Sequence, residues 1–132
     1  MLTEKIHEMS KDNLIEILIN PEKLSHQNWN ITISDQNDLS AFKKAMAIAD
    51  ETQVSGHSGP IGEWSVTLKF DSGLNTSFLA TIHKYEKEHL FLQERNYTKL
   101  KDGSYIIETL GKSRLPKMAK WMTYQTSRIG TQ

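Results

Sequence analysis

Two kinds of hydrophobic pattern occur along this chain. Between Trp64 and Phe70 apolar and polar residues alternate strictly, which is the period of a half-buried strand. The segment Asp35–Glu51 instead repeats apolar residues at helical spacing, and acidic residues near its start suit the positive end of a helix. The chain therefore combines helices with strands, which indicates an α+β fold.

The N-terminal part predicts a helix and then a short strand. Ser10 is a suitable N-cap, and Pro21 cannot continue a helix, so we expect a helix over about Lys11–Asn20. Its apolar residues are Leu14, Ile15, Ile17, Leu18 and Ile19. The segment Trp29–Ser34 alternates apolar and polar residues and predicts a short strand.

The second half of the chain predicts an antiparallel meander. A turn at Asp71–Gly73 precedes a strand over Thr76–Tyr85, and Leu90–Asn96 forms the next strand. An Asp-Gly pair within Lys101–Ser104 predicts a hairpin, after which the meander ends at Gly111. We expect four or five strands in this sheet.

A closing helix is predicted from Pro116, with Ser113 as its cap. The whole chain, residues 1–132, then forms a single α+β domain, with N-terminal helices and the C-terminal helix packed mainly on one face of the meander. That face carries Trp64, Val66, Leu68 and Phe70.

The amino-acid composition excludes several kinds of chemistry but says little about the fold. The 132 residues include no cysteine, which excludes disulfides, thiolate catalysis and cysteine-ligated metal sites. The N-terminal residues are too polar for a secretory signal, and no apolar run reaches the roughly 20 residues that a membrane-spanning helix needs. We expect a cytoplasmic protein that does not enter membranes.

The charges balance over the chain but not along it. Met1 to Glu63 contains ten acidic and five basic residues, whereas Trp64 onward contains six acidic and eleven basic residues. Such a split is more typical of a dipolar protein than of a nucleic-acid binder, which carries an excess of positive charge. The simplest interpretation is that the two halves pair with each other in the fold.

The leading functional hypothesis is a non-enzymatic protein-binding domain. No catalytic signature is present, and a segregated charge steers association with a partner. We expect a bacterial immunity protein or inhibitor that neutralises a basic partner, such as a toxin nuclease. The acidic surface expected to bind it consists of Glu22, Asp35, Asp38, Asp50 and Glu51.

An alternative is a small-ligand or nucleic-acid-binding module. The outer face of the closing helix combines cations with aromatic rings, which can neutralise phosphates and stack on bases. Its residues are Lys117, Lys120, Trp121, Tyr124 and Arg128. The ordinary interpretation of such a face is a solvated helix surface with Trp121 half-buried at its border.

A third hypothesis is a histidine-dependent enzyme. His57, in a glycine-rich loop, and His83 would supply the general acid and base for RNA cleavage, and Lys69 the cation that stabilises the transition state. His83, Glu86 and His89 are spaced so that a tight turn would bring three potential zinc ligands together, although the spacing matches no helical metal motif. Solvent-exposed turns select the same residues, so neither a metal nor a cofactor is expected.

The second face of the meander offers a further small-molecule site. Leu79, Thr81, His83 and Tyr85 mix apolar and polar side chains on one side of a predicted strand.

Overall fold

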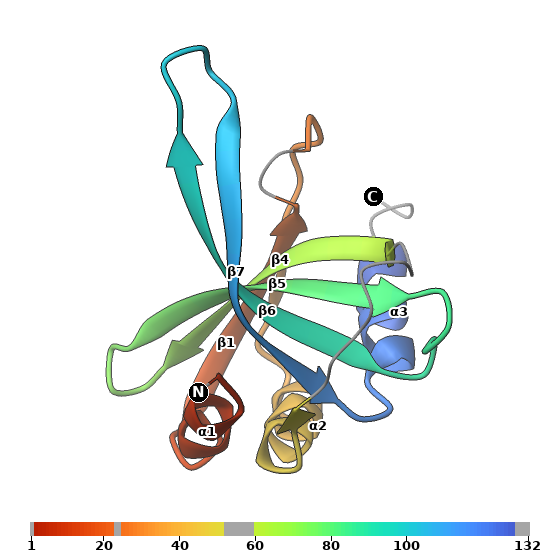
Figure 1. Ribbon diagram of the computed structural model, residues 1–132. Coiled ribbons are helices and arrows are strands. Elements are labelled where there is room, and N and C mark those ends of the chain that lie inside the picture. The colour runs from red at the N-terminus through yellow and green to blue at the C-terminus, as the bar shows by residue number, and fades with distance from the viewer. Residues whose placement is uncertain (1, 23–24, 52–59, 129–132) are drawn as a thin grey trace.

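The computed structural model describes residues 2–22, 25–51 and 60–128. Within them, the chain forms one seven-stranded antiparallel sheet, with strand order β2-β1-β4-β5-β6-β7-β3, and three helices (Figure 1). The α+β class is confirmed, but the expected four or five strands are too few. The elements are α1 (Leu2–Met9), β1 (Leu14–Pro21), β2 (Ile31–Ile33), α2 (Gln36–Ala47), β3 (Asp50–Glu51), β4 (Pro60–Phe70), β5 (Asn75–His83), β6 (Leu90–Lys99), β7 (Tyr105–Leu115) and α3 (Ala119–Ser127).

The helix predicted over Lys11–Asn20 is wrong, because this segment forms strand β1 and the helix precedes it. Ser10 does not cap the start of a helix; it lies at the end of α1, where its hydroxyl donates to the carbonyl of His7 at 2.6 Å. Strand β1 pairs with β2 on one side and β4 on the other. Two flanking strands stabilise an extended backbone here that the local apolar run alone does not specify.

The second predicted helix is confirmed as α2, although it ends earlier, at Ala47. Asp35 is its N-cap, and the Asp35 Oδ2 accepts hydrogen bonds from the backbone N–H groups of Asn37 and Asp38, both at 3.1 Å. Leu39, Phe42, Ala45 and Met46 are the buried side chains of this helix.

The predicted hairpins are confirmed, but the end of the meander is not. Strand β7 continues past Gly111 to Leu115, and helix α3 starts only at Ala119. Ser113, expected to cap that helix, is instead a buried strand residue whose hydroxyl lies 2.9 Å from Thr3 Oγ1. Ser113 therefore joins β7 to α1.

The core lies between the helices and one face of the sheet. Val66, Leu68 and Phe70 are buried there in one cluster with residues of all three helices, as the strand pattern predicted. Tight packing at this face is visible at Gly111, where an added Cβ would lie 3.0 Å from Leu2 Cβ. None of the helices in the described ranges has the length and apolar character needed to cross a bilayer.

The sheet divides at one end. Strand β5 pairs with β6 only from Leu79–Gln93 to Thr81–Phe91, whereas β6 and β7 stay paired to their common turn. The β4–β5 hairpin and the β6–β7 hairpin consequently diverge, as Figure 1 shows. We call residues 95–109 the arm and the gap between the two hairpins the fork.

Candidate functional site

The arm is a two-stranded ribbon that leaves the body of the protein (Figure 1). At its base the register of β6 and β7 shifts by one residue, between Glu94 and Arg95. Beyond this bulge β6 has β7 as its only partner strand in the described ranges. Bulges bend and twist a ribbon locally, so the shift aims the arm away from the sheet.

The arm exposes an unusual amount of apolar surface. Ile106 is 50% exposed and Ile107 is 41% exposed, and adjacent strand residues point to opposite faces, so both faces of the ribbon carry apolar groups. The exposed apolar residues of the arm and its base are Leu100, Tyr105, Ile106, Ile107 and Leu110. A cluster of large apolar side chains without cover marks a protein-docking surface more often than a solvated one.

Tyr97 connects the arm to the end of β1. Its hydroxyl donates to Glu22 Oε1 at 3.4 Å, and its ring meets that of Tyr105 edge-on, with centroids 6.4 Å apart. Burial raises the pKa of Tyr97, and the nearby Glu22 carboxylate acts in the same direction. These contacts hold the root of the arm, where Ile107 pairs with Tyr97, so its exposed apolar residues are presented in a defined direction.

The second face of the sheet carries a buried chain of hydrogen bonds. Arg95 Nε donates to Gln93 Oε1 at 3.2 Å, and Gln93 Nε2 donates to Thr81 Oγ1 at 3.3 Å. Thr81 Oγ1 in turn lies 3.0 Å from His83 Nε2, and the His83 ring meets Phe91 edge-on at 5.1 Å. Thr81, His83 and Gln93 are all buried.

This chain orients Arg95 toward a small cavity of about 180 Å³ on the second face, between β4, β5 and the arm. The cavity is lined by Ser65, Ser77, Phe78, Leu79, Gln93, Arg95 and Tyr97. Arg95 forms no ion pair with a carboxylate in the described part of the chain. Arg95 also lies close enough to the Tyr97 hydroxyl to act against the rise in its pKa, but a guanidinium has five N–H donors and retains some for an anionic or carbonyl group.

Ionic contacts tie the acidic and basic halves together, as the simplest interpretation of the charge split predicted. Arg114 donates to both carboxylate oxygens of Asp50, from Nε at 2.8 Å and from Nη2 at 2.6 Å. Lys69 lies 3.1 Å from Glu16 across β4 and β1. The hydrogen bond from Arg114 holds the pKa of Asp50 below its usual value.

The residues of the predicted acidic surface are not gathered in one patch. Asp35 and Asp38 lie at the start of α2, whereas Asp50 and Glu51 follow its other end, about 18 Å away along a 12-residue helix. Asp50 is already paired with Arg114, and Glu22 contacts Tyr97.

The predicted basic and aromatic face is also divided. Trp121 packs against Phe42, with ring centroids 5.2 Å apart, and belongs to the rim of the core. Lys120 and Tyr124 are exposed on α3, while Lys117 precedes the helix with a positive φ of 60°.

The structure separates the residues of the two histidine hypotheses. His83 pairs with Pro60 and Lys69 with Asn75, so the two lie at opposite ends of the β4–β5 ladder, and His57 lies outside the described residues. His89 Nδ1 accepts from the backbone N–H of Lys117 at 3.0 Å, and Glu86 pairs with Arg114 at 3.6 Å.

No group of three or more histidine, aspartate or glutamate side chains in the described ranges is placed to hold a metal ion. The proposed zinc set is therefore not assembled. Leu79, Thr81 and His83 of the second face are buried, and Tyr85 is exposed in the turn that follows β5.

The arm is the feature that sequence reasoning missed. The Asp-Gly pair within Lys101–Ser104 predicts a hairpin, whose second strand begins with Tyr105–Ile107, but not that this hairpin leaves the body of the sheet. Three consecutive apolar residues there break the alternation expected of a strand with one solvated face, and this was the available signal. Comparison with protein-family models, curated proteins and solved structures finds no match.

Proposed function

We propose that this chain is a non-enzymatic protein-binding domain that docks its partner with the arm. The observation that carries the proposal is the apolar surface on both faces of a ribbon that projects from the body. A projecting apolar ribbon gains stabilisation by entering a groove on another protein, because that removes its side chains from water.

The central variant is Ile106→Ser, in which an exposed apolar side chain of the arm becomes polar. Burying an isoleucine contributes about 1.5–3 kcal/mol, so its loss should weaken partner binding roughly 10- to 100-fold. The measurement is recovery of the partner from native lysate with tagged protein as bait, followed by titration of the purified pair.

The matched control is Ile48→Ser, because Ile48 is 64% exposed and follows α2, away from the arm. It should leave recovery and affinity unchanged. Equal losses of partner affinity in both variants would show that the polarity of the surface in general, and not the arm, determines binding. Unchanged affinity of Ile106→Ser would show that the arm is not part of the interface.

The finer proposal is that the partner is basic, such as a toxin nuclease inhibited by this domain. This proposal is supported by the excess of acidic over basic residues in Met1–Glu63. Among these acidic residues, Asp38 and Glu51 form no ion pair in the described ranges. Electrostatic steering acts mainly on the association rate.

Asp38→Lys should therefore slow association at low salt with little effect on dissociation. Lys44→Glu, on the same helix, should speed it. Association rates that do not respond to either change would reject a basic partner while leaving the arm proposal intact.

A further inference from the structure

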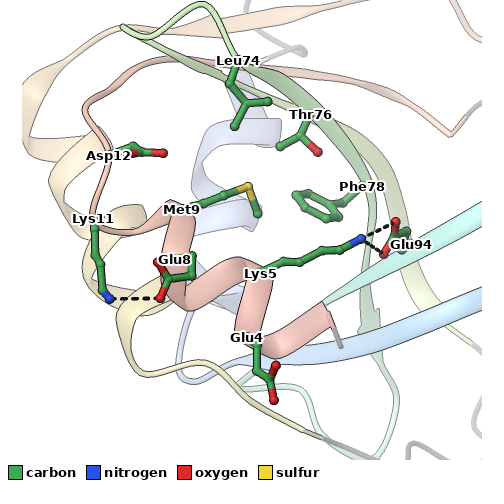
Figure 2. A pocket seen from close by; sticks show the side chains of 10 residues that line it. All are labelled: Glu4, Lys5, Glu8, Met9, Lys11, Asp12, Leu74, Thr76, Phe78 and Glu94. Carbon is green, nitrogen blue, oxygen red and sulfur yellow. Dashed lines mark hydrogen bonds and ion pairs between the residues drawn. The ribbon is translucent and has the colours of Figure 1, made fainter.

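Two cavities lie beside the fork, on opposite faces of the sheet. The larger lies on the helix side, between α1 and the β4–β5 hairpin, and has a volume of about 730 Å³ (Figure 2). Met9, Leu74 and Phe78 supply its apolar walls, and charged residues of α1 surround its mouth. Lys5 reaches from α1 to Glu94 at 3.3 Å at one side of the opening.

The smaller cavity is the one on the second face, toward which Arg95 is oriented. Phe78 lines both cavities, so they are separated by little more than the thickness of strand β5. The larger cavity has apolar walls beneath a charged mouth and room for large side chains, whereas the smaller one mixes polar and apolar side chains and includes the Arg95 cation.

Strand β5 has a free edge between these cavities. Its residues Asn75–Phe78 pair with β4 on one side, while pairing with β6 in the described ranges begins only at Leu79. In an antiparallel strand, alternate residues direct both backbone N–H and C=O toward the same neighbour. Backbone donors and acceptors of this short segment thus face the fork.

A free strand edge with a cavity on each side can bind a peptide as an additional strand of the sheet. The backbone of an extended peptide pairs with the edge, and its side chains point alternately to the two faces. A peptide along β5 therefore directs one residue to the helix-side cavity and the adjacent residue to the Arg95 side. We propose that the fork binds an extended segment of a partner protein along β5, with large apolar residues in the larger cavity and an adjacent carboxylate facing Arg95.

This site shares Arg95 with the base of the arm but uses none of the arm's exposed apolar residues. The test starts from displayed octapeptides that alternate large apolar residues with Asp, Glu or Ser, selected on the whole protein. We expect enrichment of apolar-acidic alternation, and binding of the best peptide should shift the amide resonances of Asn75–Phe78. A selection that enriches no peptide overturns the proposal.

Three changes then identify the binding mode of the enriched peptide. Leu74→Lys places a charge in the larger cavity and Arg95→Gln removes the cation from the smaller one, and each should weaken the peptide at least 10-fold. N-methylation of alternate peptide amides should do the same, since it blocks backbone pairing. Binding that tolerates all three changes overturns strand addition at the fork.

The controls separate this site from the arm and from self-association. Ile48→Lys and the arm variant Ile106→Ser should both leave peptide affinity unchanged, and peptide binding should persist even if the arm has no partner. The fork could instead be filled by a second copy of this chain. Light scattering of the wild-type protein tests this by measuring whether the protein forms a dimer. A dimer that Leu74→Lys dissociates would overturn the proposal, because the fork would then be filled by another copy.

Discussion

Thr81 is the junction of the hydrogen-bond chain on the second face, and replacing it with valine tests how much that chain contributes. Valine retains nearly the same shape but has no hydroxyl. Gln93 Nε2 and His83 Nε2 would each lose the partner that they now have at 3.3 Å and 3.0 Å. Because Gln93 is 3% exposed and His83 is 6% exposed, water cannot easily replace the lost contact.

The magnitude follows from the number of buried groups affected. Leaving one buried polar group without its partner costs about 1–3 kcal/mol. Two such groups predict that Thr81→Val lowers the free energy of unfolding by about 2–4 kcal/mol, in the lower part of the summed range because His83 has a further interaction that the substitution does not remove. A single solvated hydrogen bond would account for only about 1 kcal/mol.

Thr67→Val is the matched control, with the same substitution on the adjacent strand and the same face. Thr67 Oγ1 lies 2.8 Å from Ser77 Oγ, but this pair is exposed to water. We expect a loss under about 1 kcal/mol, because water replaces the lost partner. Urea unfolding of both variants measures the difference, and equal losses would refute the claim that burial makes the Thr81 chain important.

Two further predictions concern the edges of the sheet. The Asp50 carboxyl has a lowered pKa, so the Asp50–Arg114 pair should stabilise the fold above the unfolded pKa of about 3.9 and lose this effect as pH falls through the folded value. Because Asp50 is 45% exposed, Asp50→Asn should cost less than about 1 kcal/mol at pH 7, and its stability curve should converge with that of the wild type below about pH 4; a constant gap down to pH 2 would contradict this. Gly111→Ala should cost about 1–3 kcal/mol and speed hydrogen exchange in α1, since the new Cβ meets Leu2 Cβ at 3.0 Å. Gly73→Ala, where φ is +93° and no atom lies within 4 Å, should destabilise only its own turn, and similar exchange in α1 for both variants would show that the contact is not the cause.

Local pattern was sufficient to predict the elements whose two faces have different environments. Val66, Leu68 and Phe70 alternate with polar residues because β4 has a core face and a more polar second face, and the period shows this directly. The start of α2 was predicted from its acidic residues in the same way, since Asp35 acts on backbone groups only two and three residues away.

The elements that could not be predicted are those whose secondary structure depends on pairing with strands distant in sequence. Leu14–Ile19 is apolar except for Glu16, and periodicity alone cannot assign so short a segment to strand or helix. Its neighbours decide the matter, because Ile17 and Ile19 align with residues of β2 and β4 that are distant in sequence. The candidate site depends on such information too, since the fork exists only because β5 and β6 separate after a short ladder.

The bulge at the base of the arm also bears on how this segment can change in length during evolution. Outside it, from Arg95–Thr109 to Lys99–Tyr105, β6 and β7 pair in an unbroken register. If one residue is added to or removed from each strand, the strands still pair, but every side chain beyond the change points to the opposite face of the ribbon. If two residues are added to or removed from each strand, these side chains keep their original faces. Homologous chains that keep the same binding surface should therefore differ in this hairpin by multiples of four residues, with the body of the sheet unaltered.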